Sequence, residues 1–278
     1  TGSSSNTIGG NSAAARNIIS GSGNQGLKLL NGSNNNSISG NFFSLNAAGT
    51  AKLNNNWSNI MIVSSTGNTV GGTTAGARNV IAGSNYDGVE LEDASNNSVI
   101  GNYIGTNAAG TVALGVGRIG IYLRGSNNNI IGGSTAGMGN VVSGGNQEGI
   151  CLDASIGNLI QGNYVGTTAD GTAGLGNRYA GISIVNASNN TTIGGTADGA
   201  GNVIAGNASQ GISIQSSSVA LIQANYIGVN RSGSIIGNGG AGIYFNIGAH
   251  SNVIGGTITG AGNVIAYNGG RGVASLAD

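Results

Sequence analysis

The chain has 278 residues, no proline, one cysteine and few charged side chains. The single cysteine, Cys151, excludes an internal disulfide and argues against a thiolate metal cluster. Lysine plus arginine and aspartate plus glutamate number nine each, so the net charge is zero. This balance argues against nucleic acid or an anionic membrane surface as a partner, because both select a basic face. No stretch of about 20 apolar residues is present, so the sequence predicts no membrane span.

Glycine takes the place of the missing residue types, with 56 copies in the chain. Glycine is unfavourable inside helices, so this content argues against long helices and against βαβ crossovers that would need them. Asparagine, serine and threonine supply the polar surface that charged residues usually provide. Aliphatic residues are frequent and regularly spaced, which distinguishes the chain from a disordered low-complexity segment.

A motif of the form Asn-x-aliphatic-Gly-Gly, with threonine once in place of asparagine, recurs along the whole chain. Its central aliphatic residues are Ile8, Val70, Ile131, Ile193 and Ile254. These positions follow one another at nearly equal steps of roughly 60 residues, and a period this constant is typical of one structural unit stacked on copies of itself.

Each unit contains two similar halves, and each half begins with a marker residue followed by alternating apolar positions. The markers are Gly26, Asn59, Gly88, Gly120, Gly149, Gly181, Gly211, Gly242 and Gly272. Alternation of period two predicts a strand with one buried face, and two further short aliphatic segments follow each marker. Three strands per half, repeated nine times, predict an all-β, right-handed parallel β-helix that forms a single domain over residues 1–278.

Asparagine occupies one slot before an aliphatic pair in every predicted coil. The nine residues are Asn17, Asn41, Asn79, Asn102, Asn140, Asn163, Asn202, Asn225 and Asn263. Stacked side-chain amides can bond to one another along the axis, so we expect a structural ladder rather than a binding row. A second ladder is expected at Asn36, Asn68, Asn129, Asn158 and Asn252, interrupted at Ser98, Thr191 and Ala220.

Residues 71–83 and 101–111 carry a resemblance that extends over essentially the whole chain. The chain resembles right-handed parallel β-helix repeat proteins of the pectate-lyase-like superfamily, and more narrowly the Gly/Asn-rich repeats of large secreted bacterial surface proteins. The resemblance implies a secreted or cell-surface location and a scaffold shared by lyases, hydrolases, epimerases and adhesins. The Asp-Asp pair and the Gly-His-Gly motif of the enzymes are missing here, so no catalytic role transfers residue by residue.

One patch on the outward face of the first predicted sheet differs from the remaining surface. It contains Glu90, Glu92, Tyr122, Arg124 and Asp153 on three consecutive coils. In an enzyme, Glu90, Glu92, Arg124 and Asp153 would be catalytic and Tyr122 would bind substrate. Glu92 and Asp153 would then lie roughly 9–10 Å apart at the backbone, compatible with paired carboxylates in glycoside hydrolysis. The alternative is an exposed ion-pair ladder of Glu92, Arg124 and Asp153.

A row of aromatic residues recurs in every second coil, at Phe42, Tyr103, Tyr164 and Tyr226. Rings about 9.6 Å apart could bind an extended glycan by stacking at Tyr103, Tyr164 and Tyr226. The alternative is that each ring packs under the loop that follows it, such as residues 106–111. We expect covered rings whose hydroxyl groups reach solvent.

The sequence predicts no required cofactor and no metal site. Asp170-Gly171 and Asp198-Gly199 could bind calcium, but turns are the preferred interpretation. The leading functional hypothesis is a secreted or cell-surface structural or adhesive protein whose ligand, if it binds one, is a glycan. The alternative is a polysaccharide lyase, hydrolase or epimerase. Because complete end caps are not expected, flanking repeats or end-to-end self-association would cover the ends.

Overall fold

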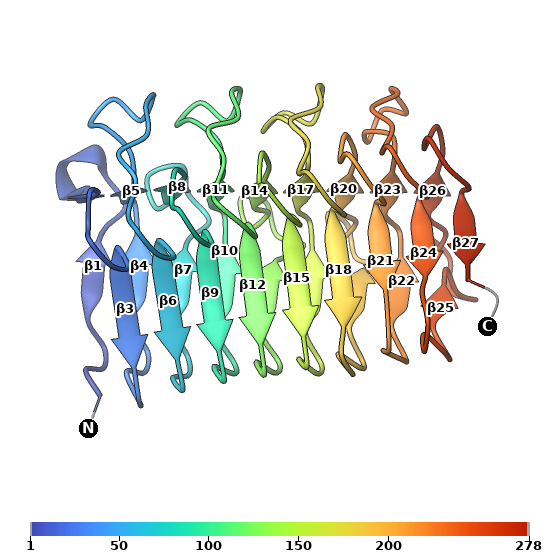
Figure 1. The fold of residues 1–278 in the computed structure, drawn as a ribbon, viewed down its shortest axis with the longest axis horizontal. Coiled ribbons are helices and arrows are strands. Elements are labelled where there is room, and N and C mark those ends of the chain that lie inside the picture. The colour runs from blue at the N-terminus through green and yellow to red at the C-terminus, as the bar shows by residue number, and fades with distance from the viewer. Residues whose placement is uncertain (1, 277–278) are drawn as a thin grey trace.

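The computed structural model describes residues 2–276, which form a right-handed parallel β-helix of nine coils (Figure 1). Each coil contributes one strand to each of three nine-stranded parallel sheets, as the sequence predicts. Glycine and other short residues turn the chain between sheets, and the only helical segment described is the 3₁₀ turn η1 (Ala13–Ala15). No helix in the described residues has the length and apolar character needed to span a membrane.

The three sheets are named here by their strands. Sheet C contains β3 (Leu27–Leu30), β6 (Ile60–Val63), β9 (Val89–Glu92), β12 (Ile121–Arg124), β15 (Ile150–Asp153), β18 (Ile182–Val185), β21 (Ile212–Ile214), β24 (Ile243–Phe245) and β27 (Val273–Ser275). Sheet A contains β1 (Thr7–Gly9), β4 (Ser37–Ser39), β7 (Thr69–Gly71), β10 (Ser98–Ile100), β13 (Ile130–Gly132), β16 (Leu159–Gln161), β19 (Thr192–Gly194), β22 (Leu221–Gln223) and β25 (Val253–Ile254). Sheet B contains β2 (Ile18–Ile19), β5 (Phe42–Phe43), β8 (Val80–Ile81), β11 (Tyr103–Ile104), β14 (Val141–Val142), β17 (Tyr164–Val165), β20 (Val203–Ile204), β23 (Tyr226–Ile227) and β26 (Val264–Ile265).

Inward side chains from all three sheets form one continuous apolar core along the axis. In the coil that begins at β12, the core side chains of Leu123, Ile131 and Val142 are fully buried. Each packs on its counterpart in the next coil because the strands pair in register, for example Leu123 with Leu152 and Val142 with Val165. Alternating apolar positions therefore fix the register, since a shift by one residue would turn every core side chain outward.

The first asparagine ladder is unbroken, as predicted. Each side-chain Nδ2 donates to the Oδ1 of the next asparagine, from Asn17 to Asn263. Asn102 shows the full pattern, because its Nδ2 also donates to the carbonyl oxygens of Val70 and Ile100. The ladder thus satisfies backbone groups at the bend between sheets A and B.

The second ladder begins earlier than predicted, because Asn6 Nδ2 donates to Asn36 Oδ1, and it also differs from the prediction at Ser98. Asn97, and not Ser98, occupies the slot, and it accepts from Asn68 and donates to Asn129. The spacing is 29 residues on one side and 32 on the other, so counting at a fixed step misplaces the slot by one residue. A third ladder, which the sequence analysis did not identify, joins Asn177, Asn207, Asn238 and Asn268.

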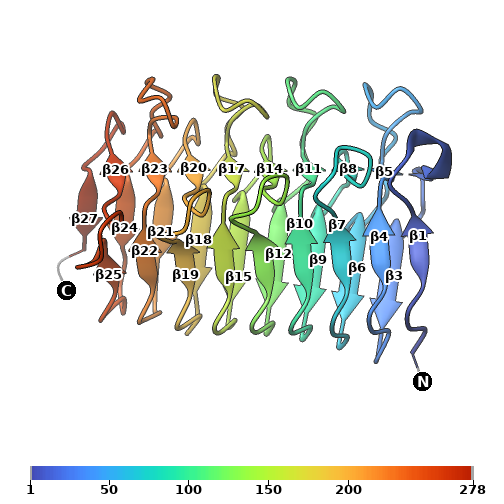
Figure 2. The ribbon, with the colours of Figure 1, turned by 180° about the vertical axis from the view of Figure 1, so that it is seen from behind.

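Every second coil carries a hairpin loop after its sheet B strand, and the four loops project along one edge (Figure 1, Figure 2). Isolated antiparallel bridges close them at Leu45–Lys52, Thr106–Ala113, Thr167–Gly174 and Val229–Ile235. Neighbouring loops are joined by main-chain bonds from Ala108 N to Gly49 O and from Ala169 N to Gly110 O. The long repeat of the sequence is therefore a pair of coils, one with a hairpin and one without.

Candidate functional site

The outward columns of sheet C have the predicted register. Lys28, Met61, Glu90, Tyr122 and Cys151 lie side by side on successive strands. The second column aligns Glu92 with Arg124 and Arg124 with Asp153. The predicted acidic patch therefore lies on one surface, across β9, β12 and β15.

A groove of about 470 Å³ lies over the first coils of sheet C. It brings four of the predicted residues, Glu90, Glu92, Tyr122 and Arg124, together with others that were not predicted. The complete lining is Gln25, Lys28, Trp57, Met61, Tyr86, Glu90, Glu92, Arg118, Tyr122 and Arg124. Asp153 is not part of the lining but contacts it through Tyr122.

The residues that sequence reasoning missed come from the turn before each sheet C strand. Trp57, Tyr86 and Arg118 each lie two positions before a marker residue. The Trp57 and Tyr86 rings are 5.0 Å apart, and the Arg118 guanidinium lies 4.2 Å from the Tyr86 centroid and 5.8 Å from that of Tyr122. Aligning this turn position across coils would have revealed an aromatic and cationic row beside the acidic strand positions.

The carboxylates on this face already have protein partners. Glu90 is nearly buried and accepts a 2.6 Å bond from Ser58 Oγ. Glu92 pairs with Arg124, whose side chain is half exposed. Of the predicted ion-pair ladder, the Glu92–Arg124 pair is therefore present, and no ion pair joins Arg124 to Asp153 within the described residues.

Asp153 takes its bonds from neutral groups. Its two oxygens accept from the Tyr122 hydroxyl at 3.0 Å and from Asn186 Nδ2 at 2.8 Å. Burial and the bond to Asp153 raise the pKa of the Tyr122 phenol well above its ordinary value. Tyr122 is therefore a hydrogen-bond donor at neutral pH and not a phenolate base.

Asp87 is a fully buried carboxyl group beneath the groove wall. Its Oδ1 accepts from Ile119 N–H at 2.9 Å and lies 3.8 Å from Arg118 Nε, while its Oδ2 is buried without a hydrogen-bond partner. Burial raises the pKa of Asp87 to about 6, against the opposing effects of the Ile119 bond and Arg118. Burial alone would lower the pKa of Arg118, but Asp87 and Tyr86 raise it above its ordinary value. Arg118 thus stays charged at the edge of the groove.

The predicted aromatic row lies on sheet B and is not brought together with the sheet C groove. Tyr103, Tyr164 and Tyr226 are half-buried, and Phe42 is buried. A Cβ at Gly110 would lie 2.9 Å from Tyr103 Cε2, so the hairpin glycine packs directly on that ring. The Arg78 guanidinium lies 3.9 Å from the same ring centroid. Tyr103 therefore has the loop and an arginine as its neighbours.

The two Asp-Gly dipeptides lie in turns. Asp170 Oδ1 accepts from the Thr168 and Thr172 hydroxyls and from Thr172 N–H, and these bonds lower its pKa. Asp198 is exposed in the turn before β20. Within residues 2–276 no cluster of three or more histidine, cysteine, aspartate or glutamate side chains is arranged to hold a metal ion.

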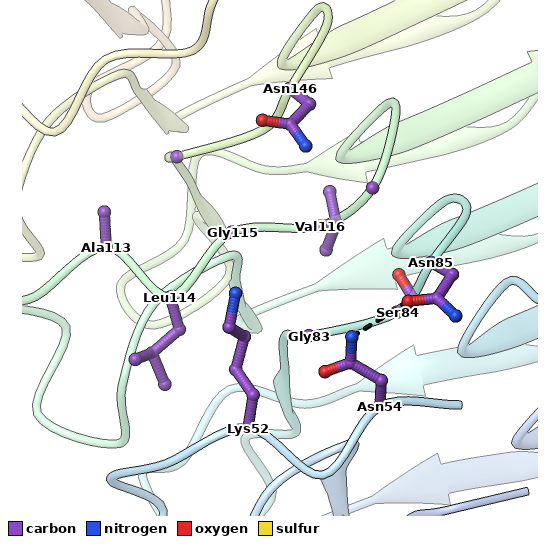
Figure 3. Close-up of a pocket in the computed structure, with 12 residues that line it drawn as sticks. Lys52, Asn54, Gly83, Ser84, Asn85, Ala113, Leu114, Gly115, Val116 and Asn146 are labelled. Carbon is purple, nitrogen blue, oxygen red and sulfur yellow. Dashed lines mark hydrogen bonds between the residues drawn. The ribbon is translucent and has the colours of Figure 1, made fainter. Parts of the chain in front are cut away.

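A second hollow of about 440 Å³ lies beside the hairpin loops (Figure 3). Lys52 extends into it between the segments that carry Gly83 and Leu114, and Asn54 Nδ2 donates to Asn85 Oδ1 at 2.8 Å. Most of its lining is glycine, alanine and asparagine, with Lys52 as the one charged group. The sheet C groove has a greater variety of chemical groups and is the stronger candidate site.

No protein-family model and no curated protein sequence matches the chain. Among solved structures, the chain is similar to the periplasmic alginate epimerase AlgG, with 15% identity and a TM-score of 0.49 over 88% of this chain and 51% of that one. It is also similar to the Dettilon tailspike protein (16% identity, TM-score 0.39, 91% and 55% covered) and to the Streptococcus pneumoniae surface protein and adhesin PfbA (13%, 0.28, 88% and 77%). The chain spans about half the length of the epimerase chain. Its three nine-stranded parallel sheets make it a parallel β-helix, as the sequence predicts.

Proposed function

We propose that this protein is a secreted or cell-surface structural β-helix that binds a glycan in the sheet C groove. The observation that carries the proposal is the convergence of Trp57, Tyr86 and Tyr122 with charged side chains in one open groove. Aromatic rings offer flat apolar faces to the C–H faces of sugars, and charged side chains can bond to hydroxyl groups. Trp57 is 47% exposed, so its indole is accessible to a ligand.

The groups around the rings can direct hydrogen bonds to a sugar. Arg118 precedes β12 and Arg124 ends it, so both ends of this strand carry a donor, and Glu92 retains acceptor capacity beside Arg124. The parallel sheet positions the strand residues of the groove, because Tyr122 lies beside Glu90 and Arg124 lies beside Glu92 on paired strands. Such a preformed groove lowers the ordering cost of binding.

The enzymatic alternative would use Glu92 and Asp153 as paired carboxylates. Glu92 is paired with Arg124, and Asp153 is held by Tyr122 and Asn186. These contacts favour a binding surface over proton transfer. Incubation with acidic and neutral oligosaccharides separates the two functions: turnover that Glu92→Gln and Asp153→Asn abolish would replace the binding proposal with an enzymatic one.

A glycan array followed by calorimetry tests the binding proposal. We expect Trp57→Ala to weaken the best ligand at least tenfold, on the order of the 1.4 kcal/mol that a tenfold change represents, and Trp57→Phe to weaken it less. Tyr244→Ala is the matched control, because Tyr244 lies in the same outward column on β24, away from the groove. An array without hits, or equal losses in Trp57→Ala and Tyr244→Ala, would contradict the proposal.

The strand edges at the two ends of the β-helix support a second proposal, which concerns its partners. β1, β2 and β3 at one end, and β25, β26 and β27 at the other, each pair on one side only within residues 2–276. We propose that these edges pair with flanking repeats or with another copy of the chain. Analytical ultracentrifugation over a concentration series tests self-pairing, and a monomer at all concentrations would contradict it.

A further inference from the structure

A separate groove of about 260 Å³ lies on the outer surface of sheet B, over β11, β14 and β17. Tyr103, Val141 and Tyr164 line it, and the turn at residues 133–137 and the hairpin residue Ala169 also contribute. Arg78 and Arg231 belong to the lining, which contains no aspartate or glutamate. This groove therefore has two cationic groups and no carboxylate, unlike the sheet C groove.

Arg78 has donors that the described protein does not use. Its guanidinium lies 3.9 Å from the Tyr103 centroid, and its Nε is buried without a hydrogen-bond partner. Neither ion pair of the described residues involves Arg78. A guanidinium that contacts a ring through its face still has N–H groups directed outward in its own plane, where carboxylates, sulfates and phosphates bind.

Arg231 reaches the same groove from a different coil. It follows β23 in the fourth hairpin, at the position that Ala47, Ala108 and Ala169 occupy in the other three hairpins. One of its nitrogens donates to Gly201 O at 2.6 Å, and its guanidinium carbon lies 5.8 Å from the centroids of both Tyr164 and Tyr226. Its charge thus lies beside the end of the groove opposite Arg78, held by a backbone carbonyl.

Two aspartates lie near this groove, and within the described residues neither forms an ion pair with Arg78 or Arg231. Asp170 lines an adjoining hollow together with Arg231. Asp170 and Asp198, which adjoin lining residues in the chain, are both exposed, and Asp170 already accepts bonds from Thr168 and Thr172. The hydroxyl groups of Ser134 and Thr135 add neutral donors to the lining.

We propose that the sheet B groove binds a ligand that carries an oxyanion, with Arg78 and Arg231 as its cationic contacts. The shared chemistry is a carboxylate, sulfate ester or phosphate ester. Tyr103 and Tyr164 are positioning residues for the two arginines in this site. The groove is separate from the proposed glycan site on sheet C, so either site can exist without the other.

The test follows the arginine Nε–H signals by NMR in the intact chain. Glucuronate, glucose 6-sulfate and glucose 6-phosphate are titrated separately, with glucose as the neutral control. We expect at least one anionic sugar to shift the Arg78 Nε–H signal saturably, glucose to leave it unchanged, and added salt to weaken the effect. The anionic sugar that binds most tightly identifies the oxyanion that the groove prefers.

Four variants decide the assignment. In these variants binding is measured by calorimetry, because Arg78→Gln removes the Arg78 signal. Arg78→Gln and Arg231→Gln should each weaken binding at least tenfold, whereas Arg178→Gln makes the same charge change at an exposed arginine outside the groove and should have no effect. Trp57→Ala should leave this binding intact, which separates its outcome from that of the glycan proposal. The inference is overturned if no anionic sugar shifts the Arg78 signal, if Arg178→Gln weakens binding equally, or if Arg78→Gln lowers only thermal stability.

Discussion

The two halves of sheet C have the same backbone and different outer surfaces. From β3 to β15 the first outward column carries Lys28, Met61, Glu90, Tyr122 and Cys151. From β18 to β27 the same column carries Ser183, Ser213, Tyr244 and Ala274. The inward apolar residues and the first asparagine ladder are common to both halves, so the chemistry of the face varies without a change in the fold.

The largest expected effect tests what the two halves share. Asn102→Ala and Asn202→Ala each remove one step of the first ladder, in the first and second half respectively. Each asparagine donates to one or more main-chain carbonyls and to the next asparagine, so each change leaves several buried groups unpaired. We expect each to lower the free energy of unfolding by roughly 3–5 kcal/mol, measured by chemical denaturation. A loss below about 1 kcal/mol in either half would show that the ladder does not stabilise both equally.

The next effect concerns a buried acid that only the first half carries. The pKa of Asp87 is raised from 3.8 to about 6, so the folded chain binds more protons than the unfolded chain between these values. The free energy of unfolding should therefore fall as pH rises from about 4 to about 6 and stay level above, by roughly 3 kcal/mol in total. Asp87→Asn should remove this dependence while keeping an acceptor for Ile119 N–H.

Denaturation midpoints of both chains from pH 4 to pH 8 measure this difference. Asp93→Asn is the control, because Asp93 is exposed in a left-handed turn that asparagine tolerates. Parallel pH profiles for wild type and Asp87→Asn would contradict a raised pKa at Asp87.

A smaller effect compares sheet B with sheet C. Tyr103 packs against Gly110 and Arg78, so Tyr103→Ala should lower the free energy of unfolding by about 1–3 kcal/mol without changing glycan binding on sheet C. Tyr226→Ala should cost less, because a Cβ at the corresponding hairpin glycine, Gly233, would meet nothing within 4 Å. Thermal denaturation and calorimetry measure the two quantities. A loss of glycan affinity at unchanged stability would instead assign the aromatic row to stacking.

The smallest effect is expected at the exposed ion pair. Glu92→Gln breaks the contact with Arg124, whose side chain is 51% exposed. Solvent screens such pairs, so the free energy of unfolding should fall by about 0–1 kcal/mol, and less at high salt. Denaturation with and without added salt measures it. A loss well above this range would mean that Glu92 supports the groove through contacts other than the ion pair.

The sequence predicted the fold closely because one physical signal repeats in every coil. The marker residues, the alternating apolar positions and the first ladder each recur nine times, and the observed strands begin directly after the markers. The prediction is wrong where the coil length changes. At Asn97 the number of residues between ladder positions is not constant, and the prediction assumed that it was. The acidic side of the groove was predicted for the same reason, since it lies on strand positions.

The aromatic side of the groove was missed for the opposite reason. Trp57, Tyr86 and Arg118 lie in turns, where neither period-two alternation nor a common residue type marks the position. Whether a side chain in a turn lines the groove depends on how the turn folds back over the sheet. Likewise, nothing local links Arg231 to Tyr164, because the hairpin after β23 brings them together across coils.

The main-chain bonds between neighbouring hairpins, which lie on alternate coils, restrict how the number of coils in this chain can change. Loss or duplication of a single coil would place two hairpins on adjacent coils, or two coils without a hairpin together, and would leave Gly49 O or Gly110 O without its Ala108 or Ala169 donor. Loss or duplication of a pair of coils keeps the spacing between hairpins, which these bonds require. We therefore expect natural length variants of this chain to differ by whole pairs of coils, the same interval that separates Ile8 from Val70 and Val70 from Ile131.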